Sequence, residues 1–283
     1  MHAFHSNWTK PFFNKHTGEY FVEDFELLTT ILSALKWQEL NGDIVMITDS
    51  IGANYYRKLG IEKVWNLGID DSLESEMDDA LDASTFWAAG KIYALQKQQA
   101  PCVMIDTDFI VWQPLVEELI RHQVSVIHRE PLEETVYPEQ SKLQMKPEYV
   151  FPQGWNWNEE ACNTAFACFN EEMFRRKYVS ESIAFMKGTQ GADALIYMVF
   201  AEQRLLAMCA SEEHVKVHAL SNTEELFHSG QRNYTHIWGY KRYLRNQPDA
   251  RRQFCKRCIE RIKKDYPNIY PLLYGIESLV TYL

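Results

Sequence analysis

The chain has 283 residues, of which 46% are hydrophobic and 24% are charged, a balance ordinary for a globular protein of one large or two modest domains. Its formal net charge of −10 argues against broad nucleic-acid binding, and it requires local positive charge wherever an anion binds. A core of this size needs no disulfide framework, and the six Cys, several of them in apolar runs, predict buried free thiols.

Strands and helices alternate over residues 1–112. Strands are expected at 4–8 and 43–50, and a helix at 24–40, where apolar residues recur at helical spacing. The next expected elements are a helix at 53–59, a strand at 63–67, an acidic loop at 70–82, a helix at 84–97 and a strand at 102–105. This alternation favours a mostly parallel sheet with helices on its faces.

The second half of the chain is less regular. A strand is expected at 124–127, and the proline- and aromatic-rich stretch 129–158 reads as an irregular excursion of the kind that is often functional. A strand at 162–170, helices at 171–185 and 192–210, an uncertain region at 217–226 and a basic helix at 249–264 follow. We expect a single domain over 1–283, with a basic helical extension at about 249–283.

Two carboxylates, Asp106 and Asp108, follow the expected strand at 102–105. In an extended chain residues i and i+2 point to the same side, so both side chains would aim at one spot at the end of the sheet. Two carboxylates at so short a distance repel each other unless a cation lies between them, and oxygen ligands suit Mg²⁺ or Mn²⁺. The alternative is a loop in which Asp forms turns and helix caps, but the strand end favours ligand binding.

This Asp106-Thr107-Asp108 pattern resembles the DXD motif of glycosyltransferases with the GT-A fold, in which a metal grips the diphosphate of a nucleotide sugar. It is similar above all to bacterial sugar transferases of the capsular or surface-polysaccharide type, and the likeness spans roughly residues 4–242. The resemblance implies a GT-A-like α/β fold with a mostly parallel central sheet flanked by helices.

Two further segments match the same family. Lys91 lies on the helix before the DXD strand, where related transferases carry a basic residue that approaches the nucleotide sugar. The run His236-Ile237-Trp238-Gly239-Tyr240-Lys241 resembles a late His-x-x-Gly-x-Lys element, which implies that His236 is the third metal ligand and that Lys241 meets the diphosphate. The alternatives are a solvated helix lysine and a structural histidine.

Weaker matches concern the substrate. Asn163 corresponds to an acceptor- or sugar-contacting asparagine, although an asparagine here also suits a turn. Because the nucleobase lies over the first strands in this fold, the resemblance implies nucleoside contacts from Ser6, Trp8 and Asp49. Glu202 matches an acidic residue near the acceptor, with a solvent-facing helix position as its alternative.

The resulting hypothesis is a metal-dependent glycosyltransferase that moves a sugar from a UDP- or GDP-sugar to a glycan or lipid-linked acceptor. Mn²⁺ or Mg²⁺ is the expected cofactor, held by Asp106, Asp108 and His236. The catalytic candidates are Asp106, Asp108 and Glu202. An inverting enzyme would need a base, and the choice stays open among Glu202, Asp193, Glu159 and Glu160.

Two other functions compete with this hypothesis. A haloacid-dehalogenase-like phosphohydrolase would use Asp106 as nucleophile and Asp108 as general acid, but it needs a later acidic pair, and the later Asp residues stand apart at 193, 249 and 265. The second alternative is a non-catalytic carbohydrate- or partner-binding protein on the same scaffold. Cys255 and Cys258 supply only two ligands, so core or surface thiols are expected there rather than zinc.

The sequence also gives expectations for the location of the protein in the cell and for the role of the basic C-terminal helix. No basic region followed by an apolar stretch opens the sequence, and no run of about 18 apolar residues occurs, so a cytoplasmic protein without a spanning helix is expected. The basic helix at 249–264 either docks on the domain with a solvated face or contacts anionic lipid weakly, at the inner face of the membrane.

Overall fold

The central element is a seven-stranded sheet, seen in a computed structural model that describes residues 1–228 and 232–283. Its strands are β10 (Val217–Ala219), β6 (Val124–Val126), β9 (Phe166–Phe169), β4 (Cys102–Ile105), β1 (His2–Asn7), β2 (Ile44–Thr48) and β3 (Ile69–Asp70), in that spatial order. Only β9 runs antiparallel to its neighbours, β4 and β6. The predicted mostly parallel sheet is therefore confirmed.

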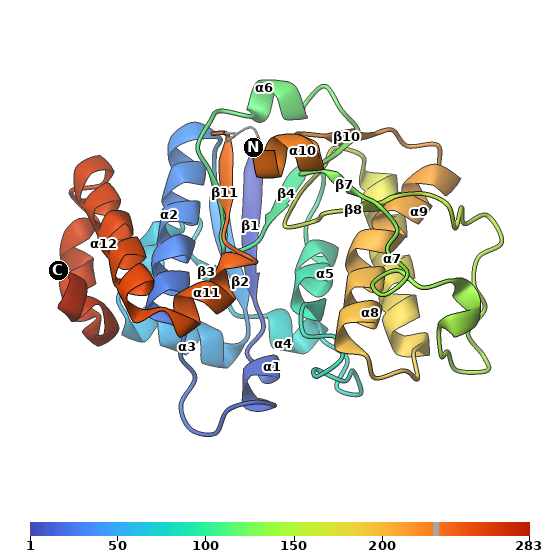
Figure 1. Cartoon of the computed structure of the whole chain (residues 1–283), viewed down its shortest axis with the longest axis horizontal. Helices are drawn as coiled ribbons and strands as arrows, with labels where there is room; N and C mark the ends of the chain where they lie inside the picture. Colours follow the sequence, from blue (N-terminus) through green and yellow to red (C-terminus); the bar gives the residue numbers. More distant parts are fainter. Residues whose placement is uncertain (229–231) are drawn as a thin grey trace.

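Helices cover both faces of this sheet, and each face has its own apolar core (Figure 1). On one face lie α2 (Asp24–Leu40), α3 (Ser50–Lys58) and α12 (Pro248–Asp265); on the other lie α5 (Ala89–Gln96), α7 (Glu172–Gly188), α8 (Ala194–Val199) and α9 (Leu205–Glu212). Successive residues of a strand point to opposite faces of the sheet. In β4, Val103 and Ile105 belong to the core under α2 and α12, and Met104 belongs to the core under α5, α7 and α9.

Shorter elements complete the chain. Two small antiparallel pairs lie beside the main sheet: β5 (Phe109–Val111) with β11 (Tyr234–His236), and β7 (Arg129–Glu130) with β8 (Ala161–Cys162). The short helices are α1 (Lys10–Phe13), α4 (Leu73–Glu76), α6 (Val116–Leu119), α10 (Thr223–His228) and α11 (Tyr240–Asn246). Tight 3₁₀ turns occur at Glu62–Val64, Gln140–Lys142, Tyr270–Gly275 and Glu277–Tyr282.

The helix predicted at 24–40 is confirmed with those bounds. Its apolar residues are buried on nearly every side because α12 packs over the side that faces away from the sheet. The inner side of α12 carries Cys255, Cys258, Ile259 and Ile262, all buried. All six cysteines are free thiols in buried positions, as expected.

Three predicted elements need correction. The strand at 63–67 is wrong, because Glu62–Val64 form a 3₁₀ turn and the chain reverses at Gly68, with φ of 76°, before β3 begins. The helix at 84–97 starts only at Ala89, since Asp82 accepts hydrogen bonds from Ser84 and forms a turn there. The strand at 162–170 is split into β8 and β9 by a bend at 163–165.

The segment Ala194–Glu212 is one continuous helical rod, in which a π-helical turn at Phe200–Arg204 joins α8 to α9. By length and composition it is apolar enough to cross a membrane, but 72% of its most apolar window is buried inside the protein. It therefore has the burial of a core helix.

A buried chain of hydrogen bonds ties β1 to the sheet's covering elements. The Trp65 indole donates to Nδ1 of His5 over 3.2 Å, so Nε2 carries the proton and donates to the Ser33 hydroxyl over 3.0 Å. Ser33 in turn donates to the carbonyl of Phe109. Burial lowers the pKa of His5 to about 3, against a smaller opposing effect of Asp108.

This pKa predicts acid sensitivity. Below the ordinary histidine pKa the unfolded chain binds a proton at His5 and the folded chain does not, so the free energy of unfolding should fall by about 1.4 kcal/mol per pH unit from this residue as pH drops from about 6.5. Denaturant titrations over pH 4 to 7 should give a shallower slope for His5→Gln than for the parent protein. The exposed control His16→Gln should keep the parent slope. Equal slopes for all three proteins would contradict the assignment.

Candidate metal and substrate site

Asp106 and Asp108 lie in the link between β4 and β5, at the carboxyl end of β4. The extended conformation expected for these residues is wrong: the chain turns, and the Phe109 amide donates to the Asp106 carbonyl over 3.0 Å. The Asp106 amide is held by the carbonyl of Ala165 at 2.7 Å. The tight turn, rather than strand alternation, brings the two carboxylates together.

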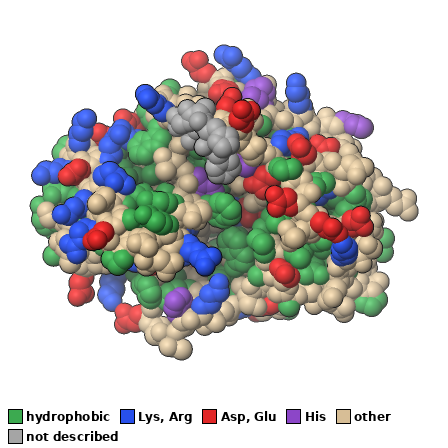
Figure 2. Space-filling model, viewed as in Figure 1, with side chains coloured by type: hydrophobic (Ala, Val, Ile, Leu, Met, Phe, Trp, Pro, Cys, Tyr) green, Lys and Arg blue, Asp and Glu red, His purple; other side chains and the backbone are tan. Residues whose placement is uncertain are grey.

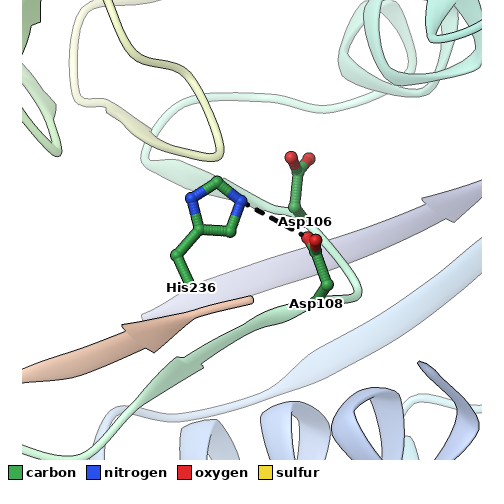
Figure 3. Close-up of side chains that lie close together, drawn as sticks. All are labelled: Asp106, Asp108 and His236. Atoms are coloured by element: carbon green, nitrogen blue, oxygen red, sulfur yellow. Dashed lines mark ion pairs between the residues drawn. The ribbon is translucent and has the colours of Figure 1, made fainter. Parts of the chain in front are cut away.

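His236 reaches the same place from the far end of the chain. Strand β11 pairs antiparallel with β5 in a register that sets His236 opposite Phe109, next to Asp108. Its Nε2 lies 3.6 Å from Oδ1 of Asp108, and Figure 3 shows the ring nitrogen directed at that carboxylate with Asp106 beside it. Possible ligand atoms of the three residues all lie within 4.8 Å of one another.

These donors fit a divalent cation. Two carboxylate oxygens and one imidazole nitrogen suit Mn²⁺ well and Mg²⁺ through the oxygens. Burial raises the pKa of Asp106 to about 6, although Lys91 opposes the rise. Burial would also raise the pKa of Asp108, but its interaction with His236 and the charge of Lys241 lower it below the usual range. Among the described residues, this is the acid and histidine cluster close enough to share an ion.

Lys91 stands on the first turn of α5 and faces Asp106, with Nζ 2.6 Å from Oδ1. It also pairs with Glu202 and donates to the Thr164 carbonyl over 3.3 Å. Burial would lower the pKa of Lys91, but Asp106 and Glu202 raise it, so the ammonium stays charged. Helix α5 can pack closely against Trp8 because residue 90 is glycine: a Cβ there would lie 2.7 Å from Cβ of Trp8.

Lys241 holds the other carboxylate. It lies on α11, and its Nζ is 2.9 Å from Oδ2 of Asp108 and 3.1 Å from Oε1 of Glu26 on α2. Burial opposes the charged form, but Asp108 and Glu26 raise the pKa of Lys241. Gly239 precedes this helix in a right-handed conformation, and a Cβ there would meet open space.

Glu202 is only 5% exposed and projects from the π-helical turn. Its Oε1 accepts a 2.6 Å hydrogen bond from Thr164 as well as the lysine contact, and its carbonyl accepts one of 2.7 Å from Tyr178. The solvent-facing alternative for this residue is therefore wrong. A π-turn shifts the register of the residues after it, and such turns are frequent at functional sites.

The predicted nucleoside contacts Ser6, Trp8 and Asp49 lie at and beyond the carboxyl ends of β1 and β2. Asp49 caps α3 by accepting from the Gly52 amide over 2.9 Å, and its other oxygen accepts from the Thr9 amide over 2.7 Å. Trp8 is partly buried against the core next to α5. Nucleoside binding by these residues stays a prediction.

Asn163 lies in the bend between β8 and β9 and donates to Glu130 over 2.7 Å, while its own oxygen accepts from the Ala165 amide over 3.1 Å. It thus has the turn role named as its alternative. Its contact with an acceptor stays a prediction. Glu130 also accepts from Tyr137, whose hydroxyl lies 2.7 Å from Oε1 of Gln203, so a polar network extends the site toward the irregular stretch.

Two of the three remaining acids considered as bases, Asp193 and Glu159, have structural partners for their carboxylates, whereas the contact of Glu160 is made by its backbone. Asp193 caps α8 by accepting from the amides of Leu195 and Ile196, both at 3.0 Å. Glu159 pairs with Arg129 at 3.1 Å, and the carbonyl of Glu160 accepts from the same guanidinium. No base is assigned among them.

Sequence reasoning missed two residues of the site, Glu26 and Thr164. Glu26 is one of several polar residues on α2, and its partner Lys241 comes from the opposite end of the chain, so no local signal distinguishes it. Thr164 stands beside Asn163, and the interruption of the expected strand by two polar residues was the available signal.

Comparisons with known proteins give a family and distant structural likenesses. A model described as a family of unknown function, DUF6734, matches residues 1–276, and no curated protein sequence matches the chain. Mouse xyloside xylosyltransferase 1 is 11% identical with a TM-score of 0.38, over 81% of this chain and 91% of that one. The bifunctional glycosyltransferase WbbM is 13% identical with a TM-score of 0.43, over 77% of this chain and 38% of its own.

A nucleoside-diphosphate-sugar pyrophosphorylase from Vibrio cholerae RC9 is 14% identical with a TM-score of 0.38, over 80% of this chain and 93% of that one. The α/β fold class predicted from the sequence is confirmed, with a mostly parallel central sheet, helices on both faces and the acidic pair at the end of β4 (Figure 1).

Proposed function

The chain belongs to DUF6734, a family of unknown function, and we propose that it is a metal-dependent glycosyltransferase that uses a nucleoside-diphosphate sugar. The observation that carries the proposal is the convergence of Asp106, Asp108 and His236 with a charged lysine on either side. A diphosphate needs cations, and on an acidic protein these side chains are where a metal and two ammonium groups would meet it.

In this proposal Asp106, Asp108 and His236 hold Mn²⁺ or Mg²⁺, and the ion supplies Lewis-acid stabilisation of the departing diphosphate. Lys91 and Lys241 stay charged through their carboxylate partners and donate to phosphate oxygens. The sugar passes through a transition state with oxocarbenium character, in which the bond between the sugar and the diphosphate weakens. The two lysines stabilise the negative charge that develops on the departing diphosphate.

Glu202 has a positioning role in this scheme rather than that of a base. Its carboxylate is engaged by both Lys91 and Thr164 and is nearly inaccessible to solvent, so it holds the lysine in place. The histidine beside the acidic pair also favours a transferase over the phosphohydrolase alternative, which needs a further acidic pair to bind Mg²⁺, whereas Glu202 and Glu26 are paired with lysines.

The basic C-terminal segment suggests how a lipid-linked acceptor would be reached. Residues 240–283 contain ten Lys or Arg and only four Asp or Glu. Ion pairs to acidic residues engage Arg245, Arg251 and Arg261. The cations on exposed positions of α12 also include Arg252, Lys256, Arg257, Lys263 and Lys264. In Figure 2 basic side chains gather at the end of the molecule formed by α12.

We infer that this helix does two things. Its apolar side docks on α2, and its outer side attracts anionic lipid at the inner face of the membrane. Each surface-attracted Lys or Arg contributes about 1 kcal/mol near an anionic bilayer, so a few free cations suffice for weak, salt-sensitive binding.

The metal-bridged nucleotide is tested by calorimetry. UDP or GDP should bind at least about tenfold more tightly with Mn²⁺ than without it, because the ion links the diphosphate to the carboxylates. Asp108→Asn should lose most of this dependence, whereas the exposed control Asp79→Asn should keep it. Equal affinity for both nucleotides with and without Mn²⁺ would rule out the metal bridge. Mn²⁺-dependent hydrolysis across a panel of nucleotide sugars would then identify the donor.

Membrane contact is tested by sedimentation with vesicles of equal parts phosphatidylglycerol and phosphatidylcholine. The protein should sediment at low salt and be released at high salt. Changing Arg252, Lys256 and Arg257 together to Gln should abolish sedimentation, and the same change at the exposed Lys15, Lys58 and Lys146 should not. Unchanged binding of the first variant would leave α12 as a docked helix only.

A further inference from the structure

Each aspartate of the site is one end of a three-residue chain of charges. Asp106 pairs with Lys91, which pairs with Glu202; Asp108 pairs with Lys241, which pairs with Glu26. The two chains have the same order, with an inner carboxylate, a lysine and an outer carboxylate.

The outer carboxylates come from opposite sides of the sheet, Glu26 from α2 and Glu202 from the π-helical turn between α8 and α9 (Figure 1). The side chains of Lys91, Asp108 and Glu202 are 11%, 8% and 7% exposed, so water screens these charges little. The side chain of Lys241 is 27% exposed, but its partner Asp108 is nearly buried, so each lysine faces an inner carboxylate at a site with one poorly screened partner.

A divalent ion between Asp106, Asp108 and His236 would compete with both ammonium groups for the same two carboxylates. It would also be repelled by them, since +1 and +2 charges would lie a few ångströms apart in a poorly screened site. A diphosphate meets the reverse problem, because four carboxylates outnumber two lysines and the site is negative without an ion. The net negative charge attracts the ion, so what opposes the ion alone is the loss of the lysine–carboxylate pairs, whereas the net charge itself opposes the diphosphate alone. When both ligands bind, the lysines can pair with the diphosphate.

We propose that Lys91 and Lys241 make the ion and the diphosphate bind as a unit. The lysines hold the inner carboxylates against an ion alone, and they transfer to the diphosphate when both ligands enter. Glu202 and Glu26 keep the lysines at the site during that exchange. This inference rests on the proposed function and adds to it a coupling between the two ligands, which must be reciprocal: the factor by which nucleotide tightens ion binding equals the factor by which the ion tightens nucleotide binding.

The first test measures Mn²⁺ binding in the absence of nucleotide, by electron paramagnetic resonance of free Mn²⁺. Lys91→Met and Lys241→Met should each bind Mn²⁺ alone about tenfold or more tightly than the parent protein, because a competing cation is gone. UDP or GDP should then tighten Mn²⁺ binding by a smaller factor than in the parent. Lys97→Met, the matched control, removes a lysine paired with Asp70 beyond α5 and should change neither quantity.

The second test uses the outer carboxylates. Glu202→Gln and Glu26→Gln should weaken binding of Mn²⁺ alone. Without its outer carboxylate, each lysine pairs only with its inner aspartate and competes more strongly with the ion for it. Adding Lys91→Met to Glu202→Gln should remove that weakening, and thermal melts of each variant check that it is folded. A general loss of fold would not be rescued by a second substitution in this way.

The outcomes separate the two proposals. If Asp108→Asn abolishes Mn²⁺ binding while Lys91→Met and Lys241→Met bind Mn²⁺ no more tightly than the parent, the coupling is overturned and the metal site stands. If Mn²⁺ binding is the same in Asp108→Asn and the parent, the metal site fails, and the proposed function fails with it.

Discussion

The pairing of β5 with β11 is the constraint on which the site depends. It joins only three residues on each side, yet it sets His236 next to Asp108 and starts α11 at the position from which Lys241 reaches the same carboxylate. The main sheet supplies the other half, since Asp106 leaves β4 with its amide held by Ala165. The cluster is thus assembled from the carboxyl end of β4, a central strand of the main sheet, and from β11, a strand near the other end of the chain.

Both helical layers contribute charges to this cluster. From one face α2 offers Glu26, and from the other α5 and the π-helical turn offer Lys91 and Glu202. The two cores therefore do more than stabilise the sheet, because a shift of either layer would change the balance of charge around the aspartates. The His5 hydrogen-bond chain adds a third tie, since it ends on the carbonyl of Phe109, beside Asp108.

The elements that could be predicted are those specified by local apolar pattern. The helix at 24–40 and the strand at 102–105 have the bounds that the sequence predicts, because apolar residues recur at helical spacing in the first and form a continuous apolar segment in the second. Val64 and Trp65 are equally buried but lie in a turn, and so short an apolar segment does not distinguish a buried strand from a buried turn. Lys91, His236 and Lys241 were indicated by spacing and resemblance, whereas Glu26 depends on a contact between chain ends.

The position of β11 has a consequence for the nascent chain on the ribosome. Asp106, Asp108, Glu26 and Glu202 are all synthesised before His236 and Lys241 emerge. Until then Asp108 lacks the lysine and the imidazole that contact it in the complete chain. The last fifth of translation therefore completes the electrostatics of the centre as well as the outer helical layer, and a chain truncated before β11 would have the sheet without a balanced site.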